Sequence, residues 1–306
     1  MLAFYGEVKE VARNIAFFIF VTGFICCGSA GSATLTVKAD GTGDVPTIQA
    51  AIDSASTGDG IVVWGGFYHE DNLLVDGKDL YFQYQHSTPV IMSSGYRQGT
   101  GITFRNVGAG TTLLGFEFRE FARGVSIENG AGTYWFCNLI DCGAAIEVSG
   151  VSSSPDIMFS LVDSCSTGIS MLDGSGIEIR NMTIVNSGTG IEALGGTASV
   201  TRCIIYGCVT GALCSGGSIS SSCNNFHLNA TDYGGCASPQ DDFYGLTRFC
   251  YSAGGSPGPY YLHSDSPCWS ENNACGVDVG AFIQLPGCTG TAVEETSWGA
   301  IKKMHR

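Results

Sequence analysis

Apolar residues recur along the middle of this chain with a period of about 22 residues, and they do so in three columns at once. The columns keep fixed separations within each repeat. They consist of Val125, Ile146, Ile169, Ile191 and Ala212; of Phe118, Leu139, Val162, Ile184 and Ile205; and of Leu113, Tyr134, Ile157, Ile179 and Val200. A short period that holds in three columns predicts a solenoid, in which each repeat packs on its neighbours.

The segments between the columns are short, β-rich and broken by Gly, Asn and Ser, so each repeat is predicted to be one coil of three short strands. A helical solenoid would need more than about 30 residues per repeat and fewer glycines. The chain holds 44 Gly in 306 residues, about twice the roughly 7% average. Gly and Asn tolerate the left-handed backbone that tight turns require. We therefore predict an all-β fold, a single-stranded parallel β-helix.

One segment before the coils has a different period, at residues 47–55. Ile48, Ala51, Ile52 and Ala55 are spaced by three and four positions, which is the pattern of one apolar helix face. We expect Asp44 near the N-cap and Pro46 near the first helical position. An N-terminal capping helix covers the open end of an apolar column, so we assign residues 34–233 to the β-helix including the capping helix 47–55.

The N-terminus carries the only long apolar run, residues 15–27, which is shorter than the roughly 20 residues of a membrane span. Arg13 precedes it and small residues, among them Ala30, follow it, as in a secretory signal peptide. We expect residues 1–30 to be a signal peptide and the mature protein to be secreted, extracellular or at the cell surface, without stable membrane insertion. An uncleaved N-terminal anchor is the alternative.

The chain has 14 Cys, a number that suits an oxidising compartment. One group falls in the repeats, where we expect buried thiols that act as small apolar fillers: Cys137, Cys142, Cys165, Cys203, Cys208 and Cys214. A second group lies where the period has ended, and there we expect disulfides that staple a Cys-rich C-terminal cap at 234–288: Cys223, Cys236, Cys250, Cys268, Cys275 and Cys288. Six cysteines allow 15 pairings. Residues 289–306 are expected to form a flexible tail.

Both ends of the predicted β-helix resemble a known family. The stretch VKADGTGDVPTIQAAIDSASTGDGIVVWGGFYHE is similar to the start of pectin-lyase-like right-handed parallel β-helix proteins, pectin methylesterases among them. The stretch SDSPCWSENNACGVDVGAF resembles the closing segment of secreted bacterial β-helix repeat proteins. The resemblance covers about residues 34–288, and it implies a right-handed β-helix and a polysaccharide or cell-surface glycan as partner.

The catalytic motifs of that family are missing. The chain has no Gln-Asp-Thr and no Arg-Pro-Trp, which pectin methylesterases carry, and the polygalacturonase-like signatures are absent as well. The nearest match to a third esterase motif, residues 241–245, lies outside the repeats. The resemblance therefore implies a scaffold, and whether the protein is an enzyme stays open.

Alternation within the strands places the residues between the apolar columns on the outer surface. It puts Asp156 beside Glu178, one coil apart, with Arg180 and Trp135 close by. Paired carboxylates about 5 Å apart can hold Ca²⁺, so we predict Asp156 and Glu178 as metal ligands. By similarity to pectate-lyase-like sites, Arg180 is the candidate catalytic base of a β-elimination. Trp135 is the candidate residue for stacking on a sugar ring.

Glu147 and Glu192 occupy another outward column, two coils or about 9.6 Å apart, and they are predicted to bind substrate. A competing interpretation treats all these residues as ordinary exposed charges, since a surface ion pair such as Asp156 with Arg180 is worth less than about 1 kcal/mol.

The formal net charge is −14 at pH 7, which repels nucleic acid. Acidic polysaccharide would also be repelled unless a bound cation mediated. The five His are scattered without the spacing of a metal site. We therefore expect Ca²⁺ as the one candidate cofactor, no nucleic-acid partner, and a monomer.

Two functions remain open. In the first, the protein interacts with carbohydrate, either by binding it or by cleaving it as a polysaccharide lyase that acts on a uronate polymer. In the second, it is a non-catalytic structural or adhesive surface solenoid. The scaffold and the Asp156 group favour the first, whereas the missing family motifs favour the second.

Overall fold

The computed structural model describes residues 32–239, 241–250 and 260–281, without the side chains of residues 86–88. The chain divides into two compact units, Met1–Thr34 and Leu35–Arg306, and the fold below is that of the second. The predicted signal peptide, Cys288 and the predicted tail lie outside the described residues. In the part that is described, no helix is long and apolar enough to cross a membrane.

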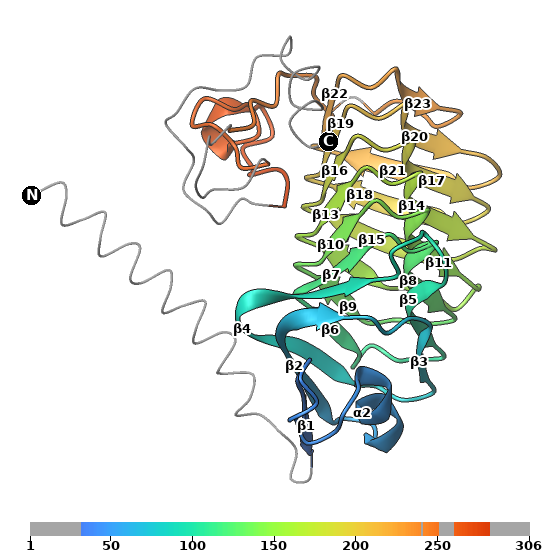
Figure 1. The fold of residues 1–306 in the computed structure, drawn as a ribbon. Coiled ribbons are helices and arrows are strands. Elements are labelled where there is room, and N and C mark those ends of the chain that lie inside the picture. Colours follow the sequence, from blue (N-terminus) through green and yellow to red (C-terminus); the bar gives the residue numbers. More distant parts are fainter. Residues whose placement is uncertain (1–31, 240, 251–259, 282–306) are drawn as a thin grey trace, which may run out of the picture. The chain divides into compact units, whose positions relative to one another are not determined.

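The second unit is a parallel β-solenoid with three faces, which confirms the predicted fold class (Figure 1). The first face consists of β6 (Thr112–Leu114), β9 (Thr133–Trp135), β12 (Asp156–Met158), β15 (Gly176–Arg180), β18 (Thr197–Thr201) and β21 (Ser218–Ser222). The second consists of β7 (Phe116–Arg119), β10 (Asn138–Ile140), β13 (Leu161–Asp163), β16 (Thr183–Val185), β19 (Ile204–Tyr206) and β22 (Asn225–His227). The third consists of β3 (Leu73–Asp76), β5 (Thr100–Arg105), β8 (Arg123–Glu128), β11 (Ala144–Ser149), β14 (Thr167–Leu172), β17 (Thr189–Leu194), β20 (Thr210–Cys214) and β23 (Thr231–Gly234).

Two long strands open the solenoid. Strands β2 (Gly60–Tyr68) and β4 (Tyr81–Ser93) pair with each other, and the start of β4 pairs with β6 while its end pairs with β7. Each long strand therefore bends from the first face into the second. Strand β1 (Thr34–Val37) pairs with β2 at the edge.

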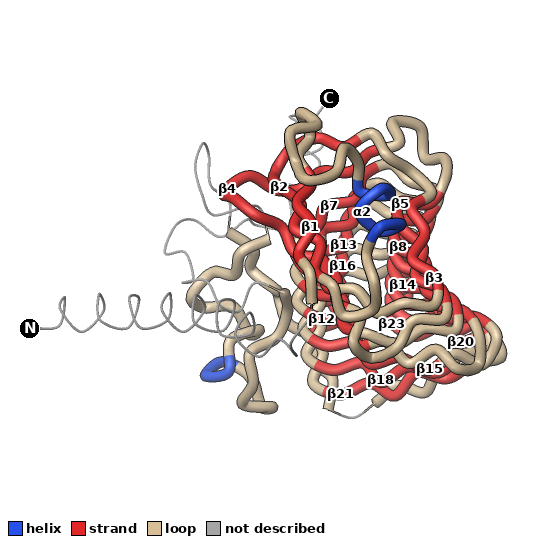
Figure 2. Tube along the Cα trace, turned by 90° about the horizontal axis from the view of Figure 1, so that it is seen from below, coloured by secondary structure: helices blue, strands red, loops and turns tan. Residues whose placement is uncertain are grey.

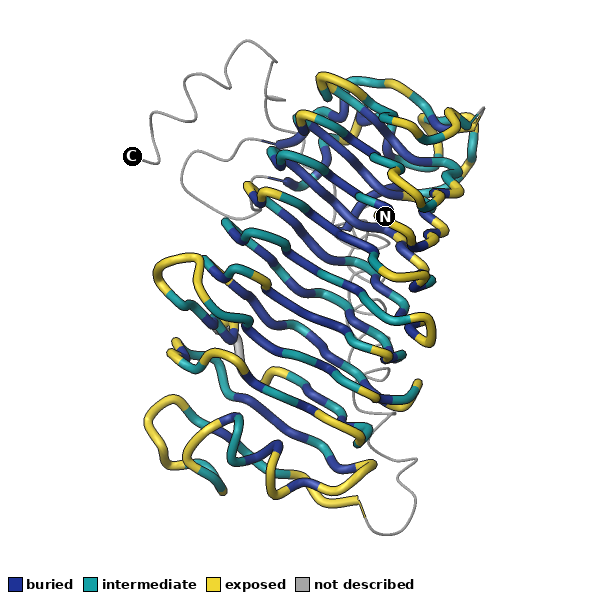
Figure 3. The backbone as a smooth tube through the Cα atoms, turned by 90° about the vertical axis from the view of Figure 1, so that its right-hand side faces the viewer, coloured by how far each residue is buried: buried dark blue, intermediate teal, exposed yellow. Residues whose placement is uncertain are grey.

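The register of the strands confirms the predicted apolar columns. On the third face, Ile146 pairs with Val125 on one side and with Ile169 on the other. Ile169 in turn pairs with Ile191. These four side chains are at most 2% exposed, and burial of such a side chain stabilises the fold by about 1.5–3 kcal/mol. The core is thus a column of stacked aliphatic residues, which appears as continuous dark bands along the coils in Figure 3.

The corner between the first and second faces requires one residue with positive φ in every coil. Phe136, Phe159, Asn181, Arg202 and Cys223 occupy this position, with φ between 49° and 57°. Asn181 is therefore a turn residue, as an Asn at a coil corner leads one to expect. Phe and Arg at the equivalent position are more surprising, because left-handed backbone costs a non-glycine residue about 1–2 kcal/mol.

At three of these corners, the residue that follows accepts a hydrogen bond from a backbone N–H of the preceding coil: Ser160, Cys203 and Asn224. Cys137 N–H donates to Ser160 Oγ at 3.0 Å, and Cys203 N–H donates to Asn224 Oδ1 at 2.7 Å. At the next corner Cys142 N–H donates to Cys165 Sγ at 3.4 Å. The predicted buried thiols of the repeats are confirmed for five positions: Cys137, Cys142, Cys165, Cys203 and Cys208. Of these, Cys165 and Cys203 also accept a hydrogen bond from a backbone N–H.

Helix α2 (Ile48–Ser54) lies across the N-terminal end of the coils, as predicted (Figure 2). Its N-cap is Thr47, whose side chain accepts from Ala50 N–H, so the expectation of Asp44 near the cap is wrong. Val45 forms a bridge with Val37, which keeps the chain extended up to the helix. The carboxylate of Glu70 accepts hydrogen bonds from the first N–H groups of the helix, at 2.8 and 3.1 Å.

Among the described residues of the Cys-rich segment, the first ones lie at the opposite end of the coils. Asp242 is 7% exposed and accepts a hydrogen bond of 2.8 Å from Asn224 N–H, together with bonds from Ser221 and Tyr233. The chain then turns back along the second face instead of staying at the end. There Phe249, Tyr260, Leu262, Cys268 and Val279 pack on Leu161, Val185, Ile204 and Tyr206. The outer side of these coils is apolar, and the returning segment keeps it from water.

The cysteines of this segment are oxidised in part. Cys223 is bonded to Cys275, Cys214 to Cys236, and Cys250 also forms a disulfide. The expectation of a thiol at Cys214 is wrong, because its strand β20 pairs with β23, and Cys236, which follows β23, bonds to it. The expectation of a disulfide at Cys268 is also wrong: its thiol is fully buried against the second face.

Candidate functional site

The first face brings the predicted acidic group together. Asp156 on β12 pairs in register with Glu178 on β15. The guanidinium of Arg180 donates to both carboxylate oxygens of Asp156, with 3.2 Å from Nε to Oδ1. Its Nε lies 3.8 Å from Glu178 Oε2. The three residues thus form one surface ion-pair cluster, as the strand register predicts.

This geometry limits the chemistry of the cluster. The hydrogen bond to Asp156 raises the pKa of Arg180, although partial burial opposes that shift, so the guanidinium stays protonated. Both oxygens of Asp156 are engaged by the same guanidinium. A proton-abstracting Arg180 or a Ca²⁺ on Asp156 would first require this ion pair to open. Among the described residues, no three or more His, Cys, Asp or Glu side chains gather where they could hold a metal ion.

Trp135 belongs to a separate aromatic group. It pairs in register with Met158, which separates it from Arg180 in the same outward column. Its ring lies 5.7 Å from that of Phe136, which stacks on Phe159 at 5.4 Å. Trp135 is thus half-buried among aromatic neighbours at the corner of the coils.

The two predicted substrate-binding glutamates lie on the third face, away from the acidic cluster. Glu147 and Glu192 both pair with Ser170, which confirms that they are two coils apart. Arg123 Nε lies 2.7 Å from Glu147 Oε1. The structure therefore does not combine Glu147 or Glu192 with Arg180 in one site.

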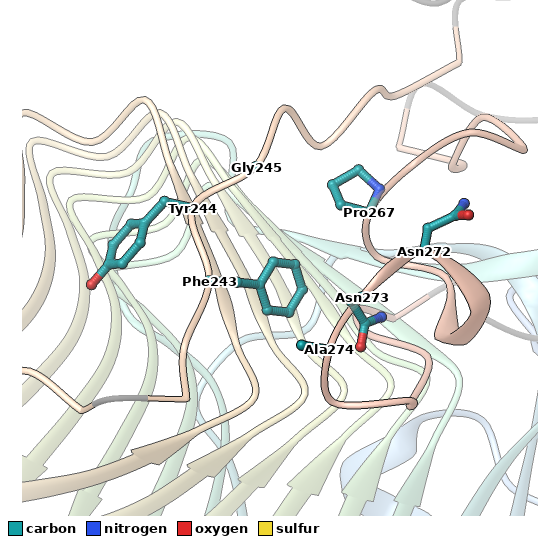
Figure 4. Close-up of a pocket in the computed structure, with 7 residues that line it drawn as sticks. All are labelled: Phe243, Tyr244, Gly245, Pro267, Asn272, Asn273 and Ala274. Carbon is teal, nitrogen blue, oxygen red and sulfur yellow. The ribbon is translucent and has the colours of Figure 1, made fainter.

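An unexpected hollow lies between the last coil and the returning C-terminal segment (Figure 4). Its volume is about 250 Å³. One wall is formed by residues 243–245 and the other by Pro267 and residues 272–274. In Figure 4 the Phe243 ring points toward the second wall, whereas the Tyr244 ring points away from it.

The first wall continues the ladder of the solenoid by one rung. Phe243 N–H donates to Asn224 O at 2.9 Å, and Phe243 O accepts from Phe226 N–H at 3.1 Å. Gly245 O accepts from the amide of Asn225 at 3.1 Å. A Cβ at Gly245 would stand 2.9 Å from Pro267 Cγ, so only glycine lets the two walls approach this closely.

The second wall is a loop held by its own side-chain amides. Asn272 Nδ2 donates to Ser264 O and Ser266 O, at 3.1 and 3.0 Å. Asn273 Nδ2 donates to Trp269 O and Val277 O, at 2.7 and 2.9 Å. The disulfide between Cys275 and Cys223 fastens this loop to the last coils.

These bonds decide which polar atoms the hollow offers. The NH₂ groups of both asparagines are used within the loop, which leaves their amide oxygens as acceptors. Asn273 Oδ1 is buried and has no hydrogen-bond partner, a rare condition for a polar atom. The hollow therefore combines the apolar ring surfaces of Phe243 and Pro267 with the amide of the exposed Asn272, whereas Asn273 Oδ1 is shielded from solvent.

Comparison with known proteins yields little beyond the architecture. No family model matches the chain, and no curated protein matches it. Among solved structures it is similar to one titled "Crystal structure of pectate lyase Pel9A", with 10% sequence identity and a TM-score of 0.43. That likeness covers 83% of this chain and 97% of the other. It is a likeness of fold.

Proposed function

We propose that this protein binds carbohydrate without cleaving it, and that the hollow between residues 243–245 and 267–274 holds one sugar unit. The observation that carries the proposal is a hollow of about 250 Å³ that is lined by the rings of Phe243 and Pro267 beside the exposed amide of Asn272. Apolar walls with a few fixed polar groups are typical of small-molecule sites. Aromatic rings pack against the C–H face of a sugar, and amide oxygens accept hydrogen bonds from its hydroxyls.

The proposal does not include catalysis, because the candidate acid–base groups lie outside the hollow. The hollow has no carboxylate, His or Lys in its walls, whereas general acid–base catalysis needs a titratable group within reach of the substrate. The acidic cluster of the first face is the second candidate, since Asp156 and Glu178 do lie side by side. It would support a Ca²⁺-assisted lyase only if Arg180 left its ion pair.

The disulfides support a proposed extracellular location, since such bonds persist in oxidising compartments. A protein in that location meets cell-surface and matrix glycans. Binding at one end of a long β-helix would suit an adhesive role, which combines the two functions that the sequence leaves open.

A pair of matched substitutions tests the proposal. Ala274 is exposed and lines the hollow, and Ala237 is exposed in the same disulfide-stapled region but does not line it. We expect the parent protein and Ala237→Trp to be retained on a glycan array, and Ala274→Trp to lose at least about tenfold in affinity, because the indole fills the hollow. No retention of the parent protein on any glycan would favour the purely structural solenoid.

The lyase function is tested with the same purified protein. Uronate polysaccharides are incubated with the protein and Ca²⁺ in the millimolar range, on the order of weak extracellular sites. We expect no ultraviolet-absorbing unsaturated product. Product that disappears in Arg180→Ala would establish the lyase instead.

A further inference from the structure

The charges around the hollow bear on the kind of sugar that it accepts. No residue of either wall is basic. Three acidic residues adjoin the walls in sequence: Asp241, Asp265 and Glu271 are all exposed. Among the described residues, Arg248 lies with its Nη1 3.9 Å from Asp265 Oδ2 and is thus directed to that carboxylate. The hollow is therefore a neutral site in acidic surroundings.

The polar atoms in the walls also disfavour an anionic ligand. A carboxylate needs N–H or cationic partners, but both side-chain NH₂ groups of the second wall already donate to carbonyls of their loop. What remains as an accessible side-chain acceptor is the amide oxygen of Asn272, and an anion placed against it would meet lone pairs. A hydroxyl would instead donate to such an oxygen and satisfy it.

We propose that the hollow is selective for uncharged, hydroxyl-rich glycans and discriminates against uronates. This inference rests on the proposed function, and it replaces the uronate polymer that the family resemblance implied. Selectivity arises mainly because uronates are excluded. A uronate carboxylate in the hollow would lose its hydration, would find no cationic or N–H partner, and would lie near other negative charges. Binding of a neutral glycan has no ion pair to screen, so salt leaves its affinity unchanged.

The experiment compares two immobilised polymers of similar length, a neutral β-glucan or mannan and polygalacturonate, at about 0.05 and 0.5 M NaCl. We expect retention on neutral polymer at both salt concentrations, and at least about tenfold weaker retention on polygalacturonate at low salt. Ala274→Trp should abolish the retention on neutral polymer and Ala237→Trp should not. Circular dichroism of both variants checks the fold.

The outcomes separate the two claims. Retention on polygalacturonate that equals or exceeds the neutral polymer, and that Ala274→Trp removes, overturns the selectivity and leaves carbohydrate binding intact. Retention that is unaffected by Ala274→Trp overturns the hollow as the site of both. Absence of retention on every polymer overturns the proposed function and this inference with it.

A second pair of variants sharpens the charge argument. Ala274→Lys places an ammonium at the rim, and Ala274→Met places a chain of similar length without charge. We expect only the Lys variant to gain retention on polygalacturonate, at least about fivefold at low salt, and to lose that gain at high salt. An equal response of the two variants contradicts the claim that missing positive charge excludes uronates.

Discussion

The coils and the returning C-terminal segment differ in how their backbone N–H and C=O groups find hydrogen-bond partners. In the coils, each strand finds its hydrogen-bond partners on the neighbouring coil, and five cysteines remain buried thiols: Cys137, Cys142, Cys165, Cys203 and Cys208. In the C-terminal segment, side-chain amides such as those of Asn272 and Asn273 satisfy the backbone, and disulfides fix the chain. Cysteine thus fills space in the inner coils, whereas the disulfides gather at the last coils and the C-terminal segment.

The contrast predicts two independent sources of stability. The coils depend on apolar burial and should be indifferent to reducing agents. The C-terminal segment has little regular structure, with η2 (Ser270–Asn272) as its one described helical turn, and it should depend on oxidation. The hollow lies at the junction, so it should fail when either side is disturbed.

The largest effect is expected from truncation inside the coils. Ile169 is fully buried between Ile146 and Ile191, and Ile169→Ala should lower the free energy of unfolding by about 2–5 kcal/mol, since it leaves a cavity in a stacked column. Chemical denaturation followed by circular dichroism measures it. Val151→Ala, at a position that is 79% exposed, is the control and should change little. A loss below about 1 kcal/mol at Ile169 would mean that the column is not tightly packed.

Removal of a disulfide should affect the C-terminal segment selectively. The bond between Cys223 and Cys275 closes a loop with a sequence separation of 52 residues, and its loss in Cys223→Ser with Cys275→Ser should cost about 2–4 kcal/mol. We expect faster proteolysis of residues 244–281 and weaker glycan retention, while the far-ultraviolet spectrum of the coils persists. Collapse of the whole β-spectrum would refute the independence of the two regions.

The buried thiols should resist alkylation until the coils unfold. Burial raises the pKa of Cys137 and of Cys208 from 9.0 to about 11, so both remain protonated and unreactive at pH 8. Because the folded pKa is the higher one, the associated stability is present below about pH 9 and is lost as the pH rises toward 11. Mass spectrometry after iodoacetamide treatment at pH 8 should show no label at either residue. Fast labelling in native protein contradicts their burial.

The smallest effect is expected at the surface ion pair. Arg180 and Asp156 are 44% and 26% exposed, and such pairs contribute less than about 1 kcal/mol. Arg180→Ala should therefore leave the unfolding midpoint nearly unchanged and leave glycan retention intact. Asp156→Ala is the matched control from the other side of the pair. A large loss of binding in either variant would move the sugar site to the first face.

The periodic part of the fold could be predicted from the sequence because one register repeats in every coil. Val125, Ile146 and Ile169 align by their spacing alone, and the outward pairing of Asp156 with Glu178 follows from the same register. The returning segment has no period, so its path was not predictable in this way. A usable signal was nevertheless present: Val185 and Tyr206 are apolar residues at outward positions of successive coils, which indicates a covered face.

The hollow could not be predicted for the same reason. Its walls come from Phe243 on the last rung and from Asn273 on the loop, and no repeat relates the two. Their approach depends on the side-chain amides of that loop and on the turn of the chain after Asp242. The positions of Asp156, Glu178 and Arg180 on the first face were predicted correctly. Whether Arg180 forms an ion pair with Asp156 stayed open, because that pair depends on side-chain rotamers that the spacing does not determine.

The C-terminal segment is anchored on two different coils, so its length restricts where the solenoid can gain or lose a coil. Tyr260 donates to Asp163 on β13 at 2.6 Å, and Gly280 N–H donates to Arg202 O at 2.8 Å, beyond β16. An extra coil inserted between β13 and β16 would separate these anchors by one strand spacing, about 4.8 Å. The same coil inserted before β10 would lengthen the molecule without stretching the segment. Natural or engineered variants of different length should therefore gain and lose coils on the N-terminal side of β13.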